Sequence, residues 1–232
     1  MSEKLKKIAD ELRFDVIKNS FSSKTPHLGS CLSCMDILVT LYWRILKIDP
    51  KNPIEKSRDR FILSKGHAAP ALFHLLAKKK FFPKEQLLTY GKDGSFFGEH
   101  PSAPGYVPGI EAATGSLGHG LPIGLGMALS TSLLNSNYRV FVLLSDGECN
   151  EGTVWEAAMM AASKKVHNLT VVVDYNKWQA TGRSNEILKL EPLAEKWRAF
   201  GWAAKEIDGH DFEKLESSLT ESSENGSIPT VI

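Results

Sequence analysis

The chain has 232 residues, of which 42% are apolar and 24% are charged, and its formal net charge at pH 7 is +1. These values are ordinary for a globular domain and give no electrostatic reason to expect a nucleic-acid or membrane partner. No apolar run is long enough to cross a bilayer, and residues 1–14 resemble neither a signal peptide nor a transit peptide. We therefore expect a cytoplasmic protein with a single domain over residues 1–232.

Apolar patterning along the chain predicts helices that alternate with strands. The predicted helices cover residues 3–20, 34–46, 69–80, 84–90, 118–134, 153–165, 192–200 and 211–222. The predicted strands cover residues 61–64, 139–145, 169–174, 203–207 and 229–232. This alternation predicts the α/β class, with a doubly wound and mainly parallel sheet that carries helices on both faces.

Two long connections and three cysteines need a separate explanation. Residues 91–111 are rich in Gly and Pro, and we expect this loop to be functional because it contains His100. Cys31 and Cys34 form a CxxC motif, but no second such pair supplies the remaining ligands of a zinc site. We therefore interpret the cysteines as small apolar residues, and not as a metal or redox site.

Polar turns follow two neighbouring strands. The strand predicted at 139–145 leads into Asp146 and Gly147, and the strand predicted at 169–174 leads into Asn176. Open α/β sheets bind ligands at the carboxyl edge, where we expect these turns to lie at the surface. A carboxylate and a carboxamide suit Mg²⁺ or Ca²⁺, and a glycine lets the backbone approach a phosphate closely. A surface turn of a generic doubly wound domain is the alternative.

The turns resemble a known cofactor motif. Asp146 and Asn176 match the thiamine diphosphate motif, in which Gly-Asp-Gly is followed about thirty residues later by Asn, although Ser145 replaces the first Gly. A serine fits there only if the position does not need a positive φ. Further matches occur in the same order as in the N-terminal, diphosphate-binding half of transketolase. They are PHLG at 26–29, SKGH at 64–67, GEHP at 98–101 and TGSLGHG at 114–120.

The resemblance implies thiamine diphosphate held through Mg²⁺ (or Ca²⁺), and it implies a set of site residues. The implied metal ligands are Asp146, Asn176 and the backbone carbonyl of Trp178. Residues 177–191 are expected to fold over this metal site. The implied cofactor-binding residues are His67, Gly115, Leu117, Gly147 and Asn176.

Three histidines match family positions that line the cofactor and sugar channel. By this resemblance His67 lies beside the diphosphate, and His27 and His100 face the sugar, so all three are implied catalytic residues. His119 stands where many relatives carry Gln. Glu151 is open to two interpretations: it complements a helix dipole, or it belongs to a carboxylate network between subunits.

The implied reaction is transfer of a two-carbon ketol unit from a ketose phosphate to an aldose phosphate. The pyrimidine-binding and C-terminal domains of transketolase have no counterpart in the chain, so we expect a subunit of a split transketolase. Such a subunit needs a C-terminal partner subunit, in a two-plus-two assembly. The alternatives are a truncated chain, another thiamine enzyme (deoxyxylulose-phosphate synthase-like or 2-oxoacid dehydrogenase-like) and a non-catalytic binding subunit.

Overall fold

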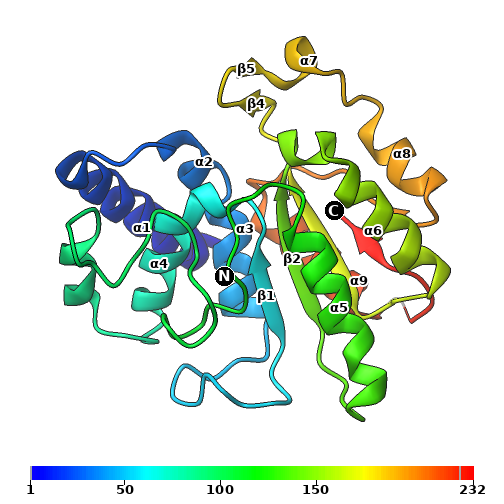
Figure 1. Cartoon of the computed structure of the whole chain (residues 1–232), viewed down its shortest axis with the longest axis horizontal. Helices are drawn as coiled ribbons and strands as arrows, with labels where there is room; N and C mark the ends of the chain where they lie inside the picture. Colours follow the sequence, from blue (N-terminus) through cyan, green and yellow to red (C-terminus); the bar gives the residue numbers. More distant parts are fainter. Residues whose placement is uncertain (1, 225) are drawn as a thin grey trace.

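A parallel sheet forms the centre of the computed structural model, which describes residues 2–224 and 226–232 (Figure 1). The sheet has five strands in the order β1-β2-β3-β7-β6, and each neighbouring pair is parallel. The strands are β1 (Arg60–Leu63), β2 (Val140–Ser145), β3 (Leu169–Asp174), β6 (Ala203–Ala204) and β7 (Thr230–Val231).

Helices cover both faces of this sheet, as the alternation predicted. Strand β2 shows why, because Phe141 and Leu143 pack in one core and Val140 and Val142 in the other. The first core takes helices α1 (Ser2–Ser23), α2 (Leu28–Ser33), α3 (Met35–Thr40), α4 (Ala69–Lys78) and α9 (Phe212–Glu224). The second takes α5 (Gly120–Leu133), α6 (Gly152–Ser163) and α8 (Leu193–Ala199).

Short elements connect these helices and strands. The predicted helix at 34–46 is α3 followed by one π-helical turn at Leu41–Ile45, and the one at 84–90 is a 3₁₀ helix at Lys84–Thr89. Two more 3₁₀ turns lie at Gly66–Ala68 and Gly147–Asn150. The sequence prediction missed α2, the antiparallel pair β4 (Trp178–Gln179) and β5 (Gly182–Arg183), and α7 (Ser184–Ile187).

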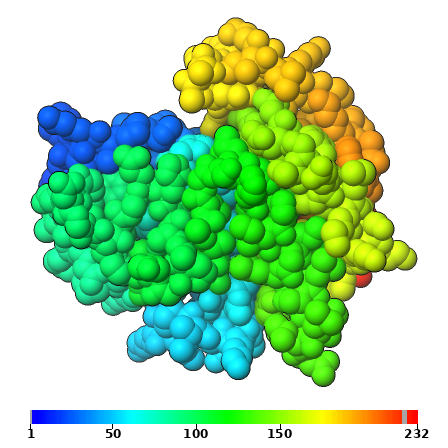
Figure 2. Space-filling model, in the orientation of Figure 1, coloured from blue at the N-terminus to red at the C-terminus, as the bar shows by residue number. Residues whose placement is uncertain are grey.

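The carboxyl ends of β2 and β3 are in register. Ser145 pairs with Asp174 at the last position of the two strands, so the turns that follow them start side by side. The segment with β4, β5 and α7 lies beyond this edge and forms the yellow lobe at the top of Figures 1 and 2. Within the part of the chain that the structure describes, no helix has both the length and the apolar character to cross a membrane.

Candidate functional site at the carboxyl edge of the sheet

Asp146 follows β2 and is buried, so the expectation that this turn lies at the surface was wrong. Its Oδ1 accepts a hydrogen bond from the N–H of Gly147 at 2.8 Å. Its Oδ2 accepts one from the N–H of Lys177 at 3.0 Å and one from the hydroxyl of Ser184 at 2.7 Å. Burial is the main cause of a raised Asp146 pKa, which these hydrogen bonds oppose. The segment after β3 therefore folds against the turn after β2.

Asn176 lies next to Lys177, so the same contact holds both candidate metal ligands at one edge. The Nδ2 group of Asn176 donates a hydrogen bond to Asp174 Oδ2 at 3.2 Å. Its Oδ1 accepts one from the N–H of Trp178 at 2.9 Å. Oxygen atoms from a carboxylate, a carboxamide and a backbone are the ligands that Mg²⁺ and Ca²⁺ take.

No group of three or more His, Cys, Asp or Glu side chains among the described residues is placed to hold a metal ion. This absence suits the implied site, because only one of its three ligands is a side chain of those four types.

Ser145 is compatible with the motif despite its Cβ. It is the last residue of β2 and is absent from the described residues with a positive φ, so its conformation does not require glycine. Its hydroxyl accepts a hydrogen bond from the N–H of Glu148 at 3.3 Å. The serine thus helps to form the 3₁₀ turn that starts at Gly147.

Gly147 sits against the side chain of Gln179. A Cβ at this glycine would lie 2.8 Å from Gln179 Cγ, so only glycine permits this approach. The Nε2 atom of Gln179 is buried and has no hydrogen-bond partner within the described ranges. A buried donor without a partner is costly, and an anionic oxygen would satisfy it. This orphaned donor beside the glycine turn fits a phosphate group.

Lys65 and Asp174 form a buried ion pair beneath the site. The Nζ atom of Lys65 donates to Asp174 Oδ2 at 2.5 Å, and the lysine side chain is fully buried. Burial opposes the charge of Lys65, but the neighbouring Cys34 and Asp174 outweigh it and raise the lysine pKa. The hydroxyl of Ser33 in α2 donates to the other carboxylate oxygen at 2.7 Å.

The three candidate histidines gather near the loop at 114–118. The rings of His27 and His67 are 5.3 Å apart between centroids. A Cβ at Gly115 would lie 3.0 Å from Cδ2 of His100, and a Cβ at Gly66 would lie 2.8 Å from the backbone N of Gly115. Burial, and then the charges of Lys65, His27 and His100, lower the pKa of His67 to about 4. His67 is therefore neutral at pH 7.

Glu148 connects this loop to the ends of β1 and β2. The carboxylate is buried and accepts hydrogen bonds from the hydroxyl of Ser64, from the N–H of Gly118 and from the N–H of Ser145. The hydroxyl of Thr153 in α6 donates to the carbonyl of Gly118 at 3.0 Å. These bonds fix the position of the loop with Gly115 and Leu117, the residues implied to contact the aminopyrimidine side of the cofactor.

The remaining candidates lie around this loop. His119 Nδ1 is 3.1 Å from the carbonyl oxygen of Leu117, and the histidine is exposed. Glu151 precedes α6 but makes no side-chain hydrogen bond to cap it. Cys31 and Cys34 are buried and free, and burial raises their pKa values to about 11 and about 12. Both thiols are therefore protonated at pH 7, in agreement with a structural role.

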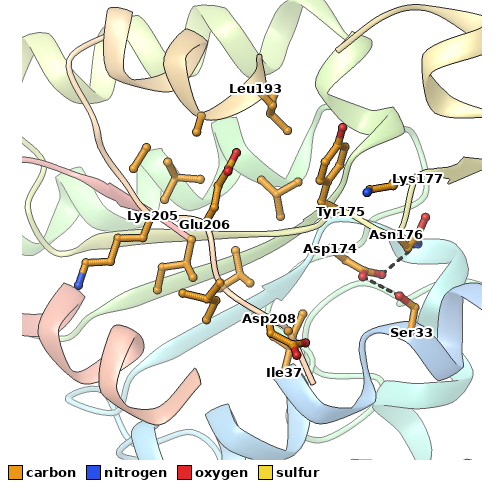
Figure 3. Close-up of a pocket in the computed structure, with 18 of the residues that line it drawn as sticks. Ser33, Ile37, Asp174, Tyr175, Asn176, Lys177, Leu193, Lys205, Glu206 and Asp208 are labelled. Carbon is orange, nitrogen blue, oxygen red and sulfur yellow. Dashed lines mark hydrogen bonds between the residues drawn. The ribbon is translucent and has the colours of Figure 1, made fainter. Parts of the chain in front are cut away.

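A pocket of about 940 Å³ opens beside the ends of β3, β7 and β6. Figure 3 shows Asp174, Asn176 and Lys177 on one side of it and Leu193 of α8 across from them. Asp146 and the three candidate histidines do not line this pocket. The cavity therefore adjoins the diphosphate side of the candidate site, and the histidines lie elsewhere.

Comparison with known proteins identifies the family. Residues 4–232 match the profile described as transketolase, thiamine diphosphate binding domain. The chain belongs to the transketolase family, and the matched part is its thiamine diphosphate binding domain.

Individual relatives agree with this assignment. One of the named subunits of the apulose-4-phosphate transketolase of Phocaeicola vulgatus is 38% identical over 213 residues, which are 92% of this chain and 75% of that protein. The 6-deoxy-6-sulfo-D-fructose transketolase subunit SqwG of a Clostridium species is 42% identical over 206 residues, 89% of this chain and 74% of that protein.

Solved transketolases confirm the fold. The structure from Campylobacter jejuni is 28% identical, with a TM-score of 0.92 over 98% of this chain and 37% of that one. The structure from Leishmania mexicana is 25% identical and has the same TM-score, over 98% of this chain and 36% of that one. This chain thus spans little more than a third of these solved transketolases.

Four residues of the site were missed by reasoning from sequence. They are Lys65, Glu148, Gln179 and Ser184. Glu148 had a usable signal, because it belongs to the acid–glycine turn after a strand and an acid there faces the sheet edge. The other three lie in loops without periodicity, where burial leaves no pattern.

Proposed function

We propose that this chain is the thiamine-diphosphate-binding subunit of a two-subunit transketolase. The enzyme transfers a two-carbon ketol unit from a ketose phosphate to an aldose phosphate, together with a C-terminal partner subunit in a two-plus-two assembly. The support is the likeness to two proteins named as transketolase subunits, each of which the chain covers over about three quarters of its length.

In this proposal Asp146, Asn176 and the carbonyl of Trp178 hold a Mg²⁺ ion on the cofactor diphosphate. The observation that carries it is the hydrogen bond from Lys177 N–H to Asp146 Oδ2, because it brings the turns after β2 and β3 together. When bound, the cofactor supplies the electron sink for breaking a carbon–carbon bond, and the ion neutralises its diphosphate. The N–H of Gly147 and the Nε2 group of Gln179 would both face phosphate oxygens.

The histidines act on hydrogen bonds and protons in this proposal. His67 is kept neutral by burial, so it offers one donor and one acceptor nitrogen without repelling the metal ion. His27 and His100 would face the sugar hydroxyls and exchange protons with them. Their place beside Gly115 and His67 supports this assignment.

Calorimetry with thiamine diphosphate and Mg²⁺, with and without a co-expressed partner subunit, tests the proposal. We expect Mg²⁺-dependent cofactor binding, and turnover of xylulose 5-phosphate only when the partner is present. Consumption of pyruvate would indicate a 2-oxoacid or deoxyxylulose-phosphate branch, and no turnover with the partner would indicate a non-catalytic binding subunit. Asp146→Ala should abolish Mg²⁺-dependent binding. An affinity within about threefold of the wild type, or under roughly 0.7 kcal/mol, would contradict the ligand assignment.

A further inference from the structure

We propose that the buried ion pair of Lys65 and Asp174 determines which way the Asn176 carboxamide faces. In this role both residues are positioning residues, which present the amide oxygen to the metal ion. The inference rests on the proposed function, since it presumes that Asn176 is a metal ligand. It adds two residues, one of them 109 positions away from the other in sequence, to the machinery of the site.

Asp174 is surrounded by donors only. Its Oδ1 accepts the hydroxyl of Ser33 at 2.7 Å, and its Oδ2 accepts the ammonium of Lys65 at 2.5 Å and the amide of Asn176 at 3.2 Å (Figure 3). An ionised carboxylate has acceptor oxygens and no donor. Only the NH₂ end of the carboxamide can therefore face Asp174, because the oxygen end would meet another acceptor.

The other end of the carboxamide is fixed in the same sense. Asn176 Oδ1 accepts the N–H of Trp178 at 2.9 Å. A flipped amide would place its NH₂ group against this N–H and its oxygen against Asp174, so two contacts would become repulsive at once. A carboxamide oxygen has two lone pairs, of which Trp178 uses one. The second lone pair is left for a cation.

Lys65 acts on Asn176 only through Asp174. Its side chain is fully buried, and its Nζ atom donates to Asp174 Oδ2 and to the carbonyl of Ser30 at 3.2 Å. A buried carboxylate without a counter-charge is strongly unfavourable, so the ammonium keeps Asp174 in its acceptor-only form. Lys65 leads directly into Gly66 and His67, which ties this arrangement to the histidine side of the site.

A double variant separates this positioning role from a purely structural one. Lys65→Met and Asp174→Asn each remove half of a buried pair, so each should lower the melting temperature. The combined variant leaves no unpaired buried charge, so it should recover at least half of that loss. The carboxamide that replaces the Asp174 carboxylate has both a donor and an acceptor end, and would no longer dictate the orientation of Asn176.

The measurement is the Mg²⁺ concentration that half-saturates thiamine diphosphate binding, in the complex of the chain with its partner subunit. We expect at least a tenfold increase in Lys65→Met/Asp174→Asn despite the recovered melting temperature. A smaller increase would overturn the inference, since it would show that metal binding follows stability alone. If wild-type protein binds no cofactor with Mg²⁺, the proposed function itself fails, which is a separate result.

A second variant keeps the inference testable if the first does not fold. Asp174→Asn/Asn176→Asp exchanges the two side chains, so the amide at position 174 donates to a carboxylate at position 176. This variant retains one carboxylate close to Lys65, and its only ligand-facing group at position 176 is again an oxygen. We expect Mg²⁺ half-saturation within tenfold of the wild type, and a larger increase would overturn the inference.

Discussion

Glu148 Oε1 accepts a hydrogen bond from the backbone N–H of Gly118 at 2.8 Å, although the two residues are 30 positions apart. The same carboxylate accepts the hydroxyl of Ser64 and the N–H of Ser145. A single buried side chain thus joins the ends of β1 and β2 to the loop implied to contact the cofactor. Three donors converge on it, so an acceptor-only group suits this position.

Glu148→Gln should therefore weaken both folding and cofactor binding. The new amide NH₂ group must face at least one of the three donors, which leaves a buried polar group unsatisfied. We expect a loss of about 1–3 kcal/mol in the free energy of unfolding, measured by chemical denaturation. Glu156→Gln on the exposed side of α6 is the matched control and should change little. Equal stability of the two variants would contradict the role given to Glu148.

Gly147→Ala should reduce thiamine diphosphate affinity by about tenfold or more, or roughly 1.4 kcal/mol. The added Cβ would lie 2.8 Å from Gln179 Cγ, so the glutamine side chain must move away from the turn that is proposed to face the diphosphate. Gly152→Ala is the control, because a Cβ there meets nothing within 4 Å. Calorimetric titration of both variants measures the difference. If Gly147→Ala binds as tightly as Gly152→Ala, the close approach has no bearing on the cofactor.

His67 predicts a pH dependence of stability in the cofactor-free protein. Burial and neighbouring charges lower its folded-state pKa from 6.5 to about 4. The unfolded chain therefore binds a proton at this residue that the folded chain refuses between these values. The contribution of His67 to stability is fully present above about pH 6.5 and is lost as pH falls toward 4.

Denaturation at several pH values between 4 and 7.5 measures this effect. The free energy of unfolding should fall less steeply with acidification in His67→Asn than in the wild type. His167→Asn, in an exposed turn, should keep the wild-type slope. A His67→Asn slope equal to that of the wild type would mean that this histidine is not desolvated in the folded protein.

His100→Ala should slow sugar turnover by about a hundredfold or more, the usual scale for losing a proton-handling group. Cofactor affinity should stay nearly unchanged, because the ring packs beside Gly115 and is not among the proposed metal ligands. Steady-state kinetics of the two-subunit complex and calorimetry with thiamine diphosphate check the two halves. Unaltered turnover would remove His100 from the site.

Much of this fold was predictable because long apolar segments show their periodicity. The strand predicted at 169–174 matches β3, and the one at 139–145 differs from β2 by a single residue. The five strands lie in one parallel sheet with helices on both faces, as expected. Elements such as β4, β5 and α7 are two to four residues long, too short for any period to show.

The site was predictable where it follows strand ends or a family motif, and not where it depends on burial. Asp146 and Asn176 follow neighbouring strands, so their common edge could be expected. The full burial of Asp146 could not, because Ser184, which covers it, is 38 positions away. Lys65 is also a typical surface residue by composition, and only its pairing with Asp174 across the fold explains its burial.

The most direct test of the central claim is a crystal structure of the chain with thiamine diphosphate and Mn²⁺, recorded at a wavelength where manganese scatters anomalously. Asp146, Asn176 and the carbonyl of Trp178 should surround one anomalous peak at metal–oxygen distances of roughly 2.0–2.3 Å, with the diphosphate on its open side. Ordered cofactor without a peak between Asp146 and Asn176, or a peak held by other residues, would contradict the account.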